Sequence, residues 1–156
     1  DRSQAWVKRV VGLPGDRIQL RQGQLFVNDH AAALKPDGMG EAEDDRGNTE
    51  RAYKFVETLP NGISHAIFKI RDNGRLDNTP EVTVPPGKLF VLGDNRDNSA
   101  DSRVAVRDGG VGLLPIDNLI GRADAVVGSW DLGMRSQPLW TWPSGFRLAR
   151  FFTAVH

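Results

Sequence analysis

Turn-forming residues divide this sequence into short apolar runs, and this feature limits the possible folds more than any other. Gly and Pro together make up 26 of the 156 residues (17 Gly and 9 Pro), which is above their usual share of roughly 12%. Most apolar runs between these turns are too short for a helix, and several alternate with polar residues, which is typical of strands. The sequence therefore predicts a mainly β fold.

Several strands and hairpins can be located from this pattern. Residues 5–11 read as a strand that ends at the turn signal Pro14-Gly15. Apolar residues alternate on both sides of Gln22-Gly23 and again on both sides of Pro60-Asn61-Gly62, so each turn predicts a hairpin. The apolar run of residues 89–92 predicts a buried strand.

The domain prediction combines the two ends of the chain. We expect residues 1–16 and 86–156 to form a β core that is incomplete at its N-terminus, with residues 17–85 inserted as a second β domain. Residues 36–50 are rich in acids and poor in apolar side chains, which predicts a mobile acidic loop. Towards the C-terminus we expect a short helix at most.

Composition excludes several kinds of function. Lys and Arg number 20, as do Asp and Glu, so a large basic surface for nucleic acid is not expected. The absence of Cys excludes thiol catalysis, zinc–thiolate sites and disulfides. No window of ~20 apolar residues suggests a membrane span. No metal or cofactor is expected, because the three His residues are isolated and no nucleotide-binding glycine pattern occurs.

The most unusual stretch is residues 93–103 (GDNRDNSADSR), called here the 93–103 segment. It concentrates carboxylates, amides, Arg and Ser directly after the predicted buried strand. Such groups are costly to bury unless they satisfy one another, so Asp101 and Arg103 are expected to pair. Two alternatives stay open: a solvated turn, or a calcium loop using Asp97, Ser99 and Asp101, although Ser102 occupies the place of its required Gly.

Lys8 is the second candidate, because it lies within an otherwise apolar run of residues 6–11. Burial disfavours the charged form of an amine, and a neutral amine can serve as general base for a serine hydroxyl. The alternative is a lysine on the solvated face of an edge strand.

The C-terminal region mixes aromatic side chains with Arg. Aromatic and basic residues together suit a membrane interface, whereas packing of a terminal helix against the core is the alternative. The residues concerned are Trp140, Trp142, Phe146, Phe151 and Phe152, with Arg135, Arg147 and Arg150.

Two of these stretches together resemble the bacterial type I signal peptidase (leader peptidase) family. Residues 8–16 (KRVVGLPGD) are similar to its lysine box, and the 93–103 segment is similar to its last box. Residues 121–123 and 142–150 are similar to Gram-negative members. The resemblance extends over about residues 5–156 and implies a mainly β catalytic core with an inserted β domain.

The resemblance also implies a Ser–Lys dyad as the catalytic machinery. Lys8 would be the general base, and Ser99 would hydrogen-bond its amine and orient it. Asp101 and Arg103 would form an ion pair that supports the site.

Trp6 and Val7 match positions that help line pockets for small side chains at −1 and −3 of the substrate. The implied substrates are signal peptides of exported preproteins. The implied location is the bacterial inner membrane, with the catalytic domain facing the periplasm and the anchor outside this chain.

One departure from the family pattern concerns the nucleophile. The family's serine lies in a Ser-Met-x-Pro box upstream of the lysine, and these 156 residues contain no such box. Ser3 is no substitute, because in a strand an odd separation from Lys8 places the two side chains on opposite faces. We therefore expect these residues alone not to cleave. The alternatives are a non-catalytic peptide-binding or calcium-binding module, and another Ser–Lys protease.

Overall fold

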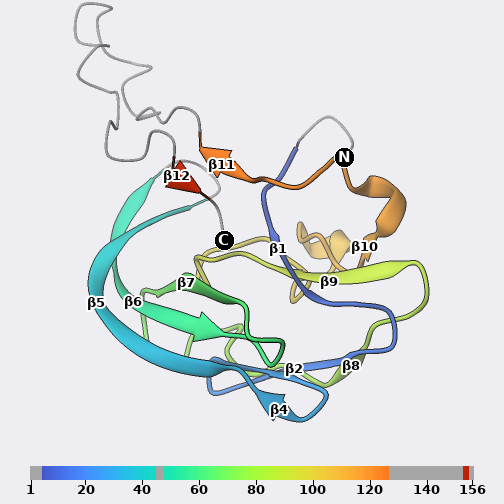
Figure 1. The fold of residues 1–156 in the computed structure, drawn as a ribbon, viewed down its shortest axis with the longest axis horizontal. Helices are drawn as coiled ribbons and strands as arrows, with labels where there is room; N and C mark the ends of the chain where they lie inside the picture. Colours follow the sequence, from blue (N-terminus) through green and yellow to red (C-terminus); the bar gives the residue numbers. More distant parts are fainter. Residues whose placement is uncertain (1–4, 45–47, 127–152, 155–156) are drawn as a thin grey trace, which may run out of the picture.

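The protein is mainly β, as predicted. A computed structural model describes residues 5–44, 48–126 and 153–154 (Figure 1). Two short 3-10 turns, Val106–Asp108 and Ile116–Asn118, are the helical elements among these residues. The strands are β1 (Arg9–Gly12), β2 (Arg17–Arg21), β3 (Gln24–Val27), β4 (His30–Ala31), β5 (Ala33–Glu43), β6 (Thr49–Thr58), β7 (Ser64–Lys69), β8 (Val82–Thr83), β9 (Lys88–Leu92), β10 (Leu114–Pro115), β11 (Ala125–Val126) and β12 (Thr153–Ala154).

The strands form four small antiparallel sheets. One has the order β1-β9-β10, so it joins the start of the chain to residues beyond 86. Two others, β4-β3-β2-β8 and β5-β6-β7, use only residues from Arg17 to Thr83. The fourth pairs β11 with β12. This pairing follows the boundaries expected for an insertion.

The hydrophobic core nevertheless crosses those boundaries. Val11 of β1 and Phe90 of β9 pack in one cluster with Ile18 of β2 and Leu25 of β3. At Gly12 an added Cβ would lie 2.8 Å from Ile18 Cδ1 and 3.0 Å from Phe90 Cβ. The sheets therefore approach closely enough that only Gly fits at this position. The division into two domains stays a prediction, because both parts share one core.

Both predicted hairpins are present. β2 and β3 pair around Gln22 and Gly23, whose φ angles of 50° and 78° are those of the two-residue turn that suits the twist of a hairpin. β6 and β7 pair from Thr58 and Ser64 outward, across the turn at residues 59–63. The predicted strand at residues 5–11 is shorter, because β1 begins only at Arg9.

Residues 36–43 and 49–50 lie in strands, although the composition of residues 36–50 predicted a mobile acidic loop. β5 extends to Glu43 and β6 begins at Thr49, and the two strands pair along their length as a long curved hairpin (Figure 1). Backbone hydrogen bonds form this ladder, so a largely exposed hairpin needs few apolar side chains. Ala42 and Ala52 are its buried positions, at 2% and 1% exposure. Composition alone could not reveal this backbone pairing.

The end of the chain is described only in part. The predicted short helix and the aromatic residues from Trp140 to Phe152 lie outside the described residues. Within the part of the chain that the structure describes, no helix is long and apolar enough to cross a membrane.

Candidate active site

Lys8 and Ser99 meet although 91 positions separate them. The Lys8 Nζ donates a hydrogen bond of 2.8 Å to the Ser99 Oγ. The cause is the antiparallel pairing of β1 with β9, in which Arg9 lies opposite Leu92. The residue before β1 therefore lies beside the segment that follows β9. Ser99 is buried at 8% exposure, and Lys8 is partly buried.

Gly93 makes room for this pair. An added Cβ at Gly93 would lie 2.1 Å from the Ser99 Oγ, 2.5 Å from the Ser99 Cβ and 3.6 Å from the Lys8 Nζ. No side chain fits in that space without moving Ser99. The glycine is thus required by close approach, a role that the sequence reasoning did not assign to it.

Asp101 and Arg103 form the expected ion pair, and both side chains are fully buried. Arg103 donates from Nε to Asp101 Oδ1 at 2.9 Å and from a terminal nitrogen to Oδ2 at 2.7 Å. The Asp101 carboxylate also accepts the backbone N–H groups of Gly93 and Arg103. Burial raises the pKa of Asp101, but Arg103 and these N–H groups lower it by more, so the pKa lies below its ordinary value. One ionised carboxylate thus joins both ends of the 93–103 segment.

A second ion pair connects the two stretches directly. Arg9 donates from Nε to Asp94 Oδ1 at 3.0 Å and from a terminal nitrogen to Oδ2 at 3.1 Å. These residues directly follow Lys8 and Gly93 in the sequence. The sequence analysis did not identify this pair, although Arg9 and Asp94 carry opposite charges and each lies in one of the two boxes.

Ser102 holds the end of the segment against β9. Its N–H donates to the Val91 carbonyl at 3.0 Å, and the Val91 N–H donates to its Oγ at 2.9 Å. Its hydroxyl donates to the carbonyl of Gly112 at 2.6 Å. The segment is therefore fixed on several sides and is not the solvated turn considered from sequence.

Trp6 and Val7 lie next to this pair on the surface. Trp6 is 43% exposed and Val7 is 82% exposed. The Lys8 Nζ lies 5.1 Å from the centroid of the Trp6 ring, within range of a cation–π contact. Both side chains are accessible to a ligand approaching Lys8. Ser3 lies outside the described residues.

The oxygens considered for calcium point to different partners. Asp97 accepts the N–H groups of Ile70 and Arg71, while Ser99 contacts Lys8 and Asp101 contacts Arg103. Among residues 5–44, 48–126 and 153–154, no group of three or more acidic or His side chains is arranged to hold a metal ion. The alternation in sequence therefore does not create a shared oxygen cage.

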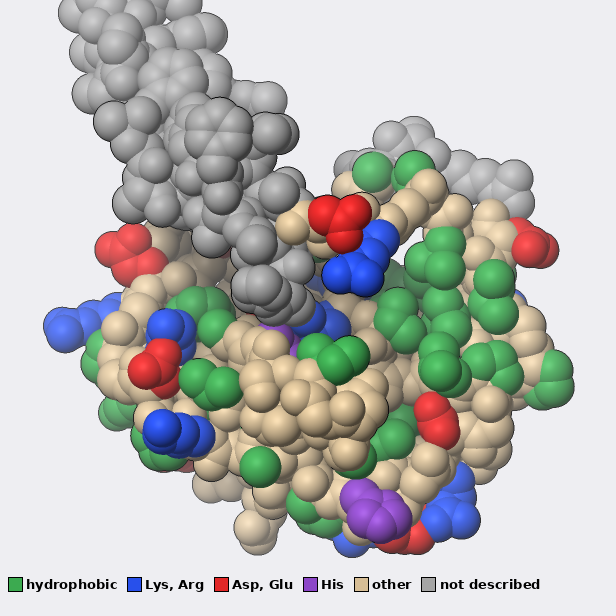
Figure 2. All heavy atoms as spheres, viewed as in Figure 1, with side chains coloured by type: hydrophobic (Ala, Val, Ile, Leu, Met, Phe, Trp, Pro, Cys, Tyr) green, Lys and Arg blue, Asp and Glu red, His purple; other side chains and the backbone are tan. Residues whose placement is uncertain are grey.

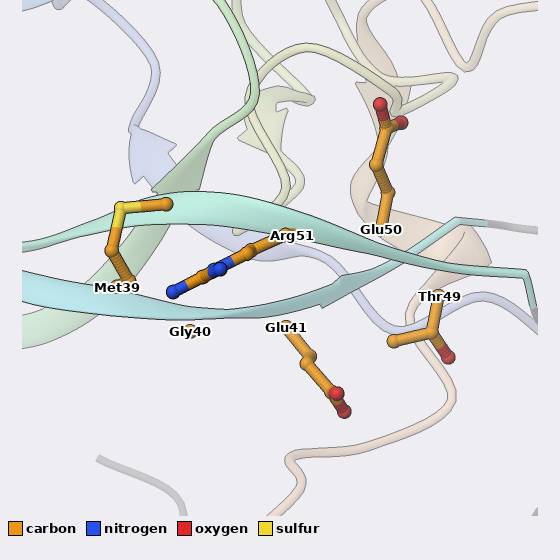
Figure 3. Close-up of a pocket in the computed structure, with 6 residues that line it drawn as sticks. All are labelled: Met39, Gly40, Glu41, Thr49, Glu50 and Arg51. Carbon is orange, nitrogen blue, oxygen red and sulfur yellow. The ribbon is translucent and has the colours of Figure 1, made fainter.

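Two surface hollows lie away from the Lys8 amine. One follows the β5–β6 hairpin, where Glu50 points away from the strands and Arg51 extends along them (Figure 3). Its lining residues are Met39, Gly40, Glu41, Thr49, Glu50 and Arg51. The other begins on β1 at Val10 and extends to the turns at Asn28 and Asn61. None of the predicted site residues lines either hollow.

This arrangement of a partly buried lysine, a hydrogen-bonded serine and a buried ion pair defines a candidate hydrolase site. The family described as signal peptidase, peptidase S26, matches residues 1–130. The chain belongs to this family, which confirms the resemblance noted from its two boxes.

Two relatives from the genus Rickettsia agree with this assignment. Signal peptidase I of Rickettsia typhi is 36% identical over 174 residues, and that of Rickettsia akari is 35% identical over 174 residues. Each alignment covers 100% of this chain and 61% of the relative, so the chain spans about three-fifths of their length. A crystal structure of signal peptidase I from Enterococcus faecalis is 23% identical and covers 73% of this chain and 78% of its own, with a TM-score of 0.36.

Proposed function

We propose that this chain carries the general base of a Ser–Lys endopeptidase that removes signal peptides from exported preproteins. The observation that supports the proposal most is the 2.8 Å hydrogen bond between the Lys8 Nζ and the Ser99 Oγ in a member of the S26 family. A partly buried lysine whose amine is oriented by one hydroxyl is suited to accept a proton from a second hydroxyl.

The proposed reaction follows from that arrangement. A serine from a box outside these 156 residues attacks the scissile carbonyl, and the neutral amine of Lys8 takes its proton. Lys8 then delivers this proton to the leaving amine as the peptide bond breaks and an acyl-enzyme forms. In the second half, Lys8 takes a proton from the attacking water and returns it to the serine oxygen as the acyl bond breaks, which releases the signal peptide and regenerates the serine.

The supporting residues have separate roles in this proposal. Ser99 orients the Lys8 amine towards the attacking hydroxyl. Asp101 and Arg103 keep the 93–103 segment in the shape that presents Ser99. Because an ionised carboxylate and a guanidinium bind each other in a fork, their geometry is directional as well as strong.

Substrate recognition would use the edge of the β1 sheet and the surface before it. β1 is the outer strand of its sheet, so an extended peptide can add beside it. Trp6 and Val7 would limit the pockets for the −1 and −3 side chains, and a small pocket excludes larger residues by steric clash.

The proposed location is the bacterial inner membrane, with this part of the protein facing the periplasm. The neighbouring apolar side chains of Leu119 and Ile120, at 48% and 88% exposure, would contact a bilayer together. Figure 2 shows hydrophobic side chains gathered on the right of one face, over the part of the fold that contains β9 and β10. The aromatic residues from Trp140 to Phe152 would add to this contact.

The test uses the full-length protein and synthetic signal peptides. A peptide with Ala at −1 and −3 should be cut once, after the −1 residue, as mapped by mass spectrometry. The same peptide with Leu at −1 should not be cut. Binding of the Ala peptide without cleavage would favour a peptide-binding module, and would contradict the proposed protease.

A further inference from the structure

Two charged side chains of the 93–103 segment turn away from Lys8. Arg96 is 1% exposed, and the side chain of Asp97 is 3% exposed. Neither contacts Lys8 or Ser99 through a described hydrogen bond. Both contact β6, β7 or the turn after β7, that is, the sheet between the two sequence boxes. Their burial in that sheet needs an explanation that the proposed reaction does not supply.

The backbone of the segment is paired with the end of β7. The Phe68 N–H donates to the Asp94 carbonyl at 2.8 Å, and the Arg96 N–H donates to the Phe68 carbonyl at 2.9 Å. These bonds make a parallel bridge between Phe68 and Asn95. The end of β7 therefore holds the backbone of residues 94–96 in place, and residue 96 lies three positions before Ser99.

The buried carboxylate of Glu57 fixes the Arg96 side chain beside these strands. One terminal nitrogen of Arg96 donates a hydrogen bond of 2.9 Å to Glu57 Oε1, and the other donates to Oε2. Glu57 is 0% exposed and lies on β6. Its cross-strand partner His65, on β7, places Nε2 3.0 Å from Glu57 Oε2. The carboxylate thus lies between two nitrogen-bearing side chains in the interior.

Asp97 is held by the residues that follow β7. Its Oδ2 accepts the N–H groups of Ile70 at 2.7 Å and Arg71 at 3.0 Å. Its Oδ1 lies 4.0 Å from the Lys69 Nζ. At Gly74 an added Cβ would lie 2.3 Å from Asp97 Oδ1, so the turn fits closely around this carboxylate. The segment is consequently anchored at two successive side chains.

We propose that Glu57 is a positioning residue, which acts through Arg96 to hold residues 94–99 so that Ser99 keeps its hydrogen bond to Lys8. The β5-β6-β7 sheet then has a function in the site without contacting substrate. A buried fork of charge-assisted bonds fixes direction as well as distance, whereas apolar contacts would fix only proximity. This inference rests on the proposed protease function.

The first arm of the test measures amide hydrogen exchange in the full-length protein. In Glu57→Gln, exchange at the amides of Phe68 and Arg96 should rise about tenfold or more, because the docked segment opens locally. Exchange at Leu20 and Leu25, in the β2–β3 hairpin, reports global unfolding and should rise only as far as the loss of unfolding free energy requires, which is less than at Phe68 and Arg96. An equal rise at all of these amides would show general destabilisation and would overturn the proposal.

The second arm measures steady-state cleavage below the melting temperature. Glu57→Gln should lower kcat about 10–100-fold and leave KM nearly unchanged, because a misoriented Ser99 affects the base and not the substrate pockets. The matched control is Leu25→Ala, which removes core packing without contacting the segment. It should lower Tm and leave kcat unchanged. A wild-type kcat in Glu57→Gln would overturn the proposal.

A double variant covers the case in which Glu57→Gln does not fold. Glu57→Leu combined with Arg96→Met replaces both charged side chains by apolar ones. Such a replacement of a buried ion pair often leaves the free energy of unfolding unchanged or raises it. Its kcat should still fall, and restoration of wild-type kcat would overturn the positioning role. If the wild-type protein cleaves no signal peptide, the proposed function fails, while the exchange measurement still decides whether Glu57 holds the segment.

Discussion

Gly93→Ala should damage the site through a single methyl group. The new Cβ would lie 2.1 Å from the Ser99 Oγ, whereas ordinary van der Waals contact begins near 3.4 Å. The Ser99 side chain must therefore move by about 1 Å or rotate away. Either change lengthens or breaks its 2.8 Å hydrogen bond with Lys8. Backbone conformation is not the obstacle, because Gly93 is not among the residues with positive φ.

The size of the effect follows from the same contacts. Overpacking a tight interior costs about 1–3 kcal/mol, and the lost hydrogen bond adds about 1 kcal/mol. The combined loss of about 2–4 kcal/mol lowers Tm by about 4–16 °C for a chain of this size. Because this hydrogen bond positions the Lys8 amine, a resulting displacement of that amine by about 1 Å lowers the rate about 100-fold.

The assay compares Gly93→Ala with Gly121→Ala in the full-length protein. No described residue has an atom within 4 Å of a Cβ added at Gly121, so its substitution should change neither Tm nor the cleavage rate. Thermal unfolding and cleavage of an Ala-at-−1 peptide are measured for both. Wild-type Tm and wild-type rate in Gly93→Ala would refute the close-approach argument.

Three further predictions concern the surrounding groups. Ser99→Ala should slow cleavage about 10–100-fold without abolishing it, because a hydrogen bond to the base is lost but no reacting atom; complete loss of activity would contradict the orienting role. Arg103→Lys should lower the unfolding midpoint, because an ammonium cannot form the buried fork with Asp101. The exposed Arg122→Lys is its control, and equal effects would contradict this reasoning. Burial raises the pKa of Glu57, but His65 and Arg96 lower it by more, from 4.5 to about 2. Because this pKa is lower in the folded state, the ionised carboxylate stabilises the protein above pH 4.5 and loses that effect as pH falls towards 2. The difference in unfolding free energy between wild type and Glu57→Gln, from urea titrations, should shrink by about 3 kcal/mol over this range; a constant difference would contradict the charge argument.

The sequence predicted those parts of the fold that local patterns specify. Alternation around Gln22-Gly23 and the apolar run of β9 led to a confirmed hairpin and a confirmed buried strand. The β5–β6 hairpin was missed because its order comes from backbone pairing along an exposed ladder, and acidic composition carries no sign of that pairing.

The residues of the candidate site could be predicted from the sequence, but the residues that hold them in place could not. The family resemblance predicted the contact between Lys8 and Ser99, because each residue lies in a recognisable box. The contact between Glu57 and Arg96 could not be predicted in the same way, since it depends on how β7 lies against residues 94–96. Gly93 was present in the box, but only the three-dimensional structure shows the atoms that exclude a side chain there.

The most direct test of the proposed base is the rate at which the full-length Lys8→Arg protein cleaves a signal peptide with Ala at −1 and −3. A guanidinium stays protonated and cannot accept the nucleophile's proton, so the rate should fall by at least about 100-fold while the unfolding midpoint stays near that of the wild type. A rate within tenfold of the wild type would show that position 8 does not carry the proton, and would contradict the assignment of Lys8 as the base.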